Sequence, residues 1–308
     1  VSLSMQINLP VVNFFAISTD SNSDFYADEI KKYGIYVGRL KFTISKDKEF
    51  NEFTDDFTCY EQYVGFYNAL RKGALAKTSI LNLQSHIDLF TKMAEDGVVN
   101  ALHIAQSAGL SPTIDNANKA IEIVKQKYPN INYIAIESST TTIGEQALVE
   151  IAMHLRDQGK TNQETANYIN SIKNNIQHFI IADDLKYLCR GGRVSTASAI
   201  FGSLLQIKPI IEFSRSGKLV VTRKIAGLNK ALKFVVDNFS NFTLNKEFPI
   251  AKIVHTDNLP LAEKLQSMIF EKYGIKPEIR IMGPIIGAHV GPGSVAFGFV
   301  SEQPRSAE

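Results

Sequence analysis

Apolar residues along the chain follow two spacings that alternate from one segment to the next. Short, mainly apolar runs are typical of strands, and longer segments with apolar residues three and four positions apart are typical of helices. In the first half, the short runs predict strands at residues 14–18, 100–105 and 131–137. The helical spacing predicts helices at residues 23–33, 112–128, 143–158 and 161–175. Strands that alternate with helices in this way favour a parallel sheet with helices on its faces.

The second half has a different pattern. Residues 207–213 and 218–223 flank the sequence Ser-Arg-Ser-Gly, which predicts a β-hairpin whose turn uses Gly217. Further strands are expected at residues 250–255, 278–282 and 294–300, and helices at residues 228–238 and 259–273. This mixture predicts a mixed sheet with helices, whereas residues 302–308 show no pattern and are expected to lack order.

The length of 308 residues exceeds what one hydrophobic core usually serves. We therefore predict an α/β protein of two α/β domains, with a ligand site between or within them. Residues 1–170 would form a domain with a parallel sheet and flanking helices, and residues 171–308 a domain with a mixed sheet and helices.

Composition narrows the classes of function. The net charge is only +2, from 33 basic and 31 acidic residues, which argues against a nucleic-acid partner because phosphate binding needs a concentrated basic face. Cys59 and Cys189 are the only cysteines and have no metal-ligand spacing, so neither a disulfide framework nor a zinc site is indicated. A reducing cytoplasm is the expected setting, and no apolar run predicts a transmembrane segment or a signal peptide.

Two arginines flank a glycine pair in the run Arg190-Gly191-Gly192-Arg193. Glycines let another molecule approach the backbone closely, and each guanidinium can donate paired hydrogen bonds to a carboxylate or phosphate. The alternative is a structural turn whose arginines pair with Asp183 and Asp184. The run by itself does not decide between an anion site and a turn.

Hydroxyl side chains follow two of the predicted strands. After the first strand, Asp20 is expected to cap the next helix and to shape the site indirectly. After the strand at 100–105, a loop contains Ser107, Gly109 and Ser111, with Pro112 at the expected first helical position. Ser111 is a candidate helix cap, and the free N–H groups of such a loop can also bind an anion. The spacing matches no nucleotide-binding loop.

Residues 283–294 contain four glycines and two prolines around His289. We expect a loop that positions this histidine through its backbone, and a histidine can donate to a carboxylate in either charge state. The other histidines have no metal-ligand spacing, so no metal site is predicted, and no serine-hydrolase motif is present. A lone histidine with a structural role is the alternative.

Taken in order, these motifs resemble the DegV family of bacterial fatty-acid-binding proteins, which includes the FakB lipid-carrier subunits. The resemblance covers nearly the whole chain. It rests on residues 18–21, Thr78-Ser79, residues 107–113, residues 185–195 and residues 283–293. The motifs at residues 185–195 and 283–293 are the most specific for this family.

The resemblance implies two α/β domains that bury one long acyl chain. Its carboxylate would be bound by Thr78, Ser79, Ser107, Ser111 and His289. Gly109, Gly191, Gly192, Gly287 and Gly291 would shape the loops. Arg190 and Arg193 would lie at the rim, where a separate, dihydroxyacetone-kinase-like fatty acid kinase docks and an acyl phosphate forms.

The implied protein is a carrier without catalytic activity or cofactor, a monomer or weak dimer with at most transient membrane contact. The alternative is a stand-alone phosphotransferase or hydrolase that uses the same anion-binding loops. Three residues depart from the family pattern, namely Ile80, Ala108 and Pro112. Ala108 removes one possible hydroxyl donor, which places more weight on Ser107.

Overall fold

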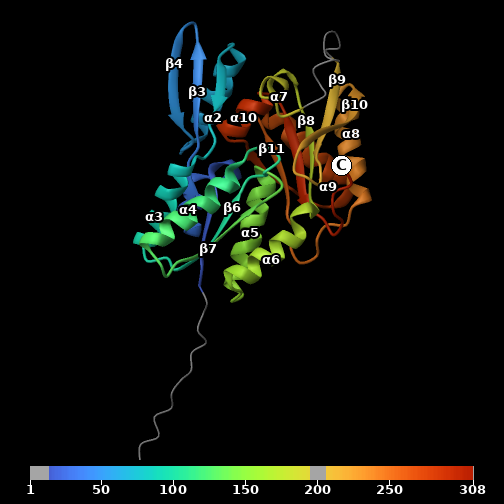
Figure 1. The fold of residues 1–308 in the computed structure, drawn as a ribbon. Helices are drawn as coiled ribbons and strands as arrows, with labels where there is room; N and C mark the ends of the chain where they lie inside the picture. Colours follow the sequence, from blue (N-terminus) through green and yellow to red (C-terminus); the bar gives the residue numbers. More distant parts are fainter. Residues whose placement is uncertain (1–13, 195–205, 308) are drawn as a thin grey trace, which may run out of the picture.

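Four parallel strands form the first sheet, in the order β2-β1-β6-β7 (Figure 1). The computed structural model describes residues 14–194 and 206–307. The strands are β1 (Ala16–Asp20), β2 (Tyr36–Gly38), β6 (Asn100–Ala105) and β7 (Asn132–Glu137). The strand expected at residues 14–18 is thus β1, two residues later, and the helix expected at 23–33 is a 3₁₀ turn, η1 (Ser21–Ser23), followed by α1 (Ala27–Tyr33).

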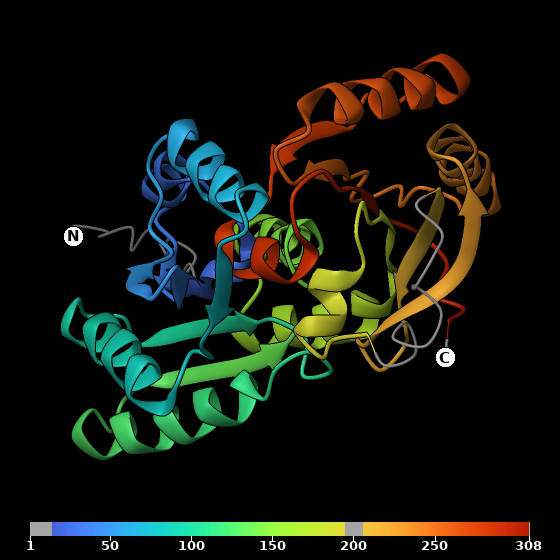
Figure 2. The ribbon, with the colours of Figure 1, turned by 90° about the horizontal axis from the view of Figure 1, so that it is seen from above.

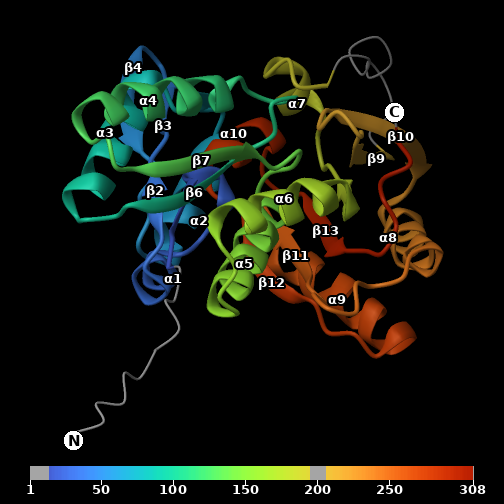
Figure 3. The same cartoon turned by 60° about the horizontal axis from the view of Figure 1, so that its bottom comes forward.

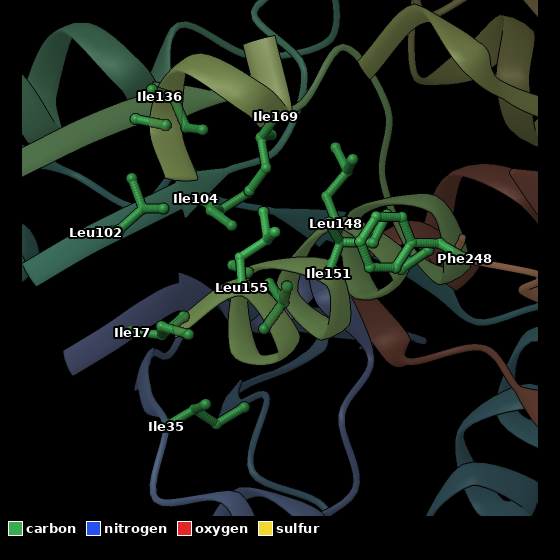
Figure 4. Packing of buried hydrophobic residues seen from close by; sticks show 14 of the residues in the cluster. Ile17, Ile35, Leu102, Ile104, Ile136, Leu148, Ile151, Leu155, Ile169 and Phe248 are labelled. Atoms are coloured by element: carbon green, nitrogen blue, oxygen red, sulfur yellow. The ribbon is translucent and has the colours of Figure 1, made fainter. Parts of the chain in front are cut away.

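Helices cover both faces of this sheet because neighbouring strand residues point to opposite sides. One face packs against α3 (Leu83–Glu95) and α4 (Thr113–Lys127). The other face packs against α5 (Ile143–Asp157) and α6 (Asn162–Ile172). Figure 4 shows residues of this second layer, with Ile104 and Ile136 of the strands and Leu148 and Ile151 of α5 in one buried cluster.

A small antiparallel sheet, in the order β4-β3-β5, was not predicted from the sequence. It contains β3 (Lys41–Lys46), β4 (Glu49–Thr54) and β5 (Leu75–Thr78), and α2 (Tyr60–Arg71) packs against it. Phe42 stacks on Phe53 at 5.4 Å between ring centroids and meets Phe66 of α2 edge-on. Since almost every residue of β4 is exposed, its sequence lacks the alternation of apolar and polar residues that predicts a half-buried strand.

The second sheet has six strands in the order β10-β9-β8-β13-β11-β12 and is mixed, since only β11 and β12 pair in parallel. The strands are β8 (Ile176–Ile181), β9 (Ile207–Phe213), β10 (Leu219–Ala226), β11 (Ala251–His255), β12 (Glu278–Ile281) and β13 (Val295–Val300). The helices α8 (Leu228–Asn238) and α9 (Leu259–Tyr273) cover the face turned away from the first half (Figure 3). The predicted fold class is confirmed.

The hairpin of β9 and β10 is also confirmed, with Gly217 of its turn at a φ of 73°. The predicted domain division at residue 170 falls inside α6, shortly before β8 begins the second sheet. Strand β8 itself was not predicted, because Gln177 and His178 interrupt its apolar residues and it directly follows a helical segment.

The expectation of disorder at the C-terminal end is wrong for residues 302–307, while residue 308 lies outside the described residues. Arg305 is only 2% exposed and donates hydrogen bonds to the carbonyls of Ile176, Ser139 and Ser214, at 2.8–3.0 Å. This one side chain therefore ties the C-terminal segment to β8, to the loop after β7 and to the hairpin turn.

The expectation of a loop around His289 is also wrong, because residues Pro284–Val290 form a short helix, α10. Proline fits the first helical position, and Gly291, at a φ of 79°, ends the helix. Gly287 consequently lies within a helix rather than in a loop. Together with α7 (Lys186–Arg190), α10 lies between the two halves (Figure 2).

Candidate functional site

A cavity with an empty volume of about 760 Å³, including the open solvent at its mouth, lies between the two halves, close to α10. Leu40, Leu110 and Ile80 line it from the first half, and Phe213, Leu219, Ile180, Ile286 and Ala296 line it from the second. The walls are therefore largely apolar, which suits a ligand with a hydrocarbon portion.

Two predicted residues, Thr78 and His289, meet on the lining of this cavity. Thr78 ends β5 and His289 lies in the last turn of α10, and Thr78 Oγ1 is 2.8 Å from His289 Nε2. Burial, assisted by the charge of Arg193, lowers the pKa of His289 to about 4. The imidazole is therefore neutral at neutral pH, with one nitrogen as a donor and the other as an acceptor.

Ser79, Ile80 and Arg193 lie on the same lining. Ser79 Oγ donates to the carbonyl of Lys41 at 3.1 Å, and Arg193 Nη1 donates to the carbonyl of Gly191 at 2.9 Å. Both side chains are exposed, so this part of the cavity opens to solvent.

Arg190 does not line the cavity. Its guanidinium lies over the ring of Tyr187, 5.6 Å from the centroid, and faces a neighbouring surface groove. The acids that could have paired with the arginines bind lysines instead, since Asp184 pairs with Lys186 and Asp183 with Lys208. Residues 195–205, which follow the glycine pair, lie outside the described residues.

The serine loop divides its hydroxyls between two tasks. Ser107 Oγ is fully buried and donates to the carbonyl of Gly217 at 2.8 Å, so it joins the two halves and is absent from the cavity lining. Ser111 lines the cavity, and its buried hydroxyl has no hydrogen-bond partner. The cap expected at Ser111 is wrong, because α4 begins at Thr113 with Pro112 as its N-terminal cap.

Two further buried polar side chains line the cavity without a partner, Gln106 through Oε1 and Thr141 through Oγ1. A buried polar atom without a hydrogen bond costs roughly 1–3 kcal/mol, so these groups favour a ligand that bonds to them. The sequence carried a signal for Thr141 that was missed. Residues 138–142 are five consecutive hydroxyl side chains after a predicted strand, the same placement as the serine loop.

His178 was also missed. It lies on β8, lines the cavity, and its Nε2 is 2.9 Å from the hydroxyl of Thr140. Burial lowers the pKa of His178 to about 3, so its imidazole is neutral and stacks edge-on against Phe213. No spacing in the sequence connects these three residues.

Several of the predicted glycines are required for close packing. A Cβ at Gly191 would overlap Nδ1 of His289, and a Cβ at Gly287 would overlap the hydroxyl of Tyr67. At Gly109 a Cβ would lie 2.6 Å from the carbonyl carbon of Gly217. Gly192, at a φ of 67°, and Gly291 are the two that need the left-handed backbone region.

Asp20 performs the predicted capping role and a second one. Its Oδ1 accepts from the N–H of Asn22 at 2.9 Å, and its Oδ2 accepts from the N–H of Gln106 at 3.0 Å. Burial raises its pKa. The carboxyl thus fixes the backbone of a cavity-lining residue, which is the indirect role expected from the sequence.

The segment that enters α10 is held by polar groups of the first half. Asp24 Oδ1 accepts from the N–H of Gly283 at 3.1 Å, and the hydroxyl of Tyr67 donates to the carbonyl of Met282 at 2.7 Å. Arg280 Nη2 donates to the carbonyl of Asp24 and pairs with Glu29. These contacts set where α10, and with it His289, lies.

Within residues 14–194 and 206–307, no group of three or more acids, histidines or cysteines could hold a metal ion. No helix among the residues that the structure describes is long and apolar enough to cross a bilayer. The arrangement is that of a binding site for an amphipathic molecule, with hydroxyls and a neutral imidazole for the polar end and an apolar wall for the remainder.

Comparisons with known proteins agree with this fold. The sequence model for uncharacterised proteins of the DegV family matches residues 14–302. A DegV domain-containing protein of Clostridium perfringens is 31% identical over 289 residues, covering 94% of this chain and 98% of the relative.

Two solved structures are similar over nearly their whole length. The fatty acid binding DegV family protein from Streptococcus agalactiae is 29% identical with a TM-score of 0.75, covering 94% of this chain and 99% of that one. The DegV lipid binding protein from Thermotoga maritima, 22% identical with a TM-score of 0.79, covers 95% and 100% and shows the shared fold. With a family match from residue 14 to residue 302, the chain belongs to the DegV family.

Proposed function

We propose that this protein binds a long-chain fatty acid in the cavity between its halves and presents the carboxylate to a separate fatty acid kinase. The observation that carries the proposal is one apolar cavity whose lining includes a neutral imidazole and unpartnered buried hydroxyls. The similar structure from Streptococcus agalactiae, described as fatty acid binding, supports the same ligand class here.

The alkyl chain supplies most of the affinity in this proposal. Each buried methylene stabilises the complex by about 0.8 kcal/mol, so a long chain can bind tightly to apolar walls alone. The carboxylate must then be met by donors, because burying it without hydrogen bonds is costly.

We assign the carboxylate to Thr78, Ser111 and His289, with Ser79 at the solvent side. Ser111 has a free donor, whereas the hydroxyl hydrogen of Ser107 is used by Gly217. Ser107 would bind the carboxylate only by giving up that contact, so we give it a supporting role. Thr141 is added as a donor that the motifs did not indicate.

The kinase step involves the exposed arginines. The kinase would transfer the γ-phosphoryl group of ATP to a carboxylate oxygen, which forms an acyl phosphate and releases ADP. Arg193 on the cavity lining would meet the new phosphate, and Arg190 on the adjoining surface would contact the kinase. The protein itself would be a carrier without catalytic activity.

Native mass spectrometry of freshly purified protein tests the binding proposal. We expect a mass adduct that is released as a fatty acid on denaturation. Thr78→Val should weaken fatty acid binding by about 10- to 100-fold, the effect of losing one hydrogen bond to a charged group. Ser111→Ala should act in the same direction, and Ser240→Ala, at an exposed serine on α8's C-terminal side, is the matched control.

The absence of any adduct, together with no binding of added palmitate, would refute the proposal. The kinase step is tested separately with Arg190→Ala, which should retain the fatty acid but lower the rate of acyl phosphate formation by an added kinase. Turnover of ATP by the protein alone would instead favour the stand-alone phosphotransferase.

A further inference from the structure

A second cavity lies on the first half, between the start of α1, the start of α2 and the end of β12. It has an empty volume of about 790 Å³, including its open mouth, and shares no lining residue with the first cavity. Its walls include Tyr26, Phe57, Tyr60 and Tyr63, and its rim includes Asp28 and Cys59.

The rings stand at steep angles to one another. Phe57 and Tyr63 meet edge-to-face, with centroids 5.0 Å apart and planes at 85°, and Tyr26 meets Tyr63 at 6.2 Å and 76°. Phe42 supports Phe57 from behind at 6.0 Å and 88°. The walls of the cavity are thus held in place by packing, and Tyr60, 46% exposed, stands at the mouth.

The charge around these rings is negative. The two segments that supply them, residues 24–29 and 55–63, contain no lysine or arginine, and of their six acids Asp28, Asp56 and Glu61 are exposed, whereas burial raises the pKa of Asp24 and Asp55. Asp28 lies on the lining itself, and no ion pair involves it among the described residues. Arg280, which lies over Tyr26, is neutralised by Glu29 at 2.6 Å and Glu278 at 2.7 Å, and Arg39 donates to the carbonyl of Asp55 at 3.0 Å.

Arg280 also shows that a ring of this cluster attracts cations. Its guanidinium carbon lies 4.0 Å from the centroid of Tyr26, within the usual cation–π range of about 6 Å. Burial and the nearby Asp24 raise the pKa of Tyr63, so its phenol stays neutral. The remaining ring surfaces of Phe57, Tyr60 and Tyr63 have no cation of the chain against them among the described contacts.

We propose that this cavity binds a trimethylammonium cation of the choline type. Aromatic walls with an acidic rim attract a positive charge. A primary ammonium or a guanidinium would need several acceptors for its N–H groups, and the lining offers chiefly ring surfaces. A trimethylammonium group donates no hydrogen bonds, so it loses little on leaving water for such walls.

Cys59 supplies a direct assay, because its thiol is exposed on the rim of the cavity. In a Cys189→Ser background, we expect tetramethylammonium and choline to slow the reaction of Cys59 with a disulfide thiol reagent, relative to sodium at equal ionic strength. Saturation-transfer NMR on the N-methyl protons measures the binding independently.

Tyr63→Leu should weaken tetramethylammonium binding about fivefold, whereas Tyr63→Phe, which keeps the ring, should preserve it. Tyr168→Leu, at a half-buried tyrosine on α6, is the matched control and should change nothing. Absence of protection and of saturation transfer would overturn the proposal, and so would equal binding by Tyr63→Leu.

The source of the cation is distinguished by comparing free choline with vesicles of phosphatidylcholine and of phosphatidylglycerol. Binding of choline in solution indicates a free metabolite, and binding only to phosphatidylcholine vesicles indicates a lipid headgroup. Because the two cavities share no residue, these outcomes do not depend on whether the first one holds a fatty acid.

Discussion

Asp55→Asn should make the folded protein less sensitive to alkaline pH. Asp55 is 6% exposed, lies close to Gly283 and the buried Asp24, and its Oδ2 has no hydrogen-bond partner. Burial, above all, raises its pKa from 3.8 to about 7. Between about pH 4 and pH 7, the folded protein therefore holds a proton on this carboxyl that the unfolded chain has already released.

The sign and size of the effect follow from this difference. A raised pKa contributes stability below the unfolded value of 3.8, and that contribution is lost as the pH rises towards 7. At about 1.36 kcal/mol for each pKa unit, the loss is complete above pH 7 and amounts to about 4 kcal/mol. Only about 1 kcal/mol of it has been lost at roughly pH 4.5.

Asparagine has nearly the same shape and does not titrate, so it removes this loss. We expect the free energy of unfolding of Asp55→Asn, relative to that of the wild type, to rise by about 3 kcal/mol between roughly pH 4.5 and pH 8.5. Any pH-independent effect of the substitution on the free energy of unfolding cancels, because the same two proteins are compared at both pH values.

Urea unfolding followed by far-UV circular dichroism at the two pH values measures this change. Asp56→Asn is the matched control, since Asp56 is the next residue but is exposed. A relative change below about 1 kcal/mol for Asp55→Asn, or an equal change for both variants, would refute the assignment of a protonated carboxyl at Asp55.

Three other predictions concern the segments that hold the site. Arg305→Met leaves buried carbonyls without donors and should lower the free energy of unfolding by about 3–5 kcal/mol. Arg223→Met, at an exposed arginine, is the control and should lower it by less than about 0.5 kcal/mol. Equal losses for the two variants would contradict the role of Arg305 in anchoring the C-terminal segment. Gly287→Ala should lower the free energy of unfolding by about 1–3 kcal/mol, because the added Cβ overlaps the side chain of Tyr67. Combined with Tyr67→Phe, it should lower this free energy by less than the sum of the two single effects. Strict additivity in urea unfolding would argue against this contact. In lipid-free protein, His289 should titrate near 4 by NMR, and a bound fatty acid carboxylate should raise that pKa; a value near 6.5 without ligand would contradict its burial.

Much of the fold could be predicted because its elements follow simple spacings. Three of the four strands of the parallel sheet, all but the short β2, and the hairpin turn at Gly217 were visible as apolar runs and turn residues. What escaped prediction depends on tertiary contacts. Strand β4 is exposed on nearly every residue. Strand β8 is buried throughout, although Gln177 and His178 interrupt its apolar residues, and α10 is a helix despite its glycines because it is packed on both sides.

The site could be predicted in part for the same reason. The motifs named Thr78 and His289, but nothing in their spacing shows that residues 211 positions apart share a hydrogen bond. The serine loop named both Ser107 and Ser111, yet only the folded chain separates the serine that joins the halves from the one that faces the cavity. Thr141 and His178 reach the lining through strand order, which the sequence does not state.

The position of α10 connects the stability of the protein to binding of the proposed ligand. Asp24 and Tyr67 of the first half hold the residues that lead into α10, and at the other end of that helix His289 bonds back to Thr78 of the first half. A ligand whose carboxylate touches Thr78 and His289 therefore binds only when the two halves are in contact. By mass action such a ligand stabilises that form by RT ln(1 + [L]/Kd), about 2.7 kcal/mol at 100 times the dissociation constant. Burial raises the pKa of Asp24, whose carboxyl accepts from the N–H of Gly283, so its ionisation disfavours folding at high pH. We therefore expect alkaline pH and loss of the proposed ligand to weaken the same contact between the halves.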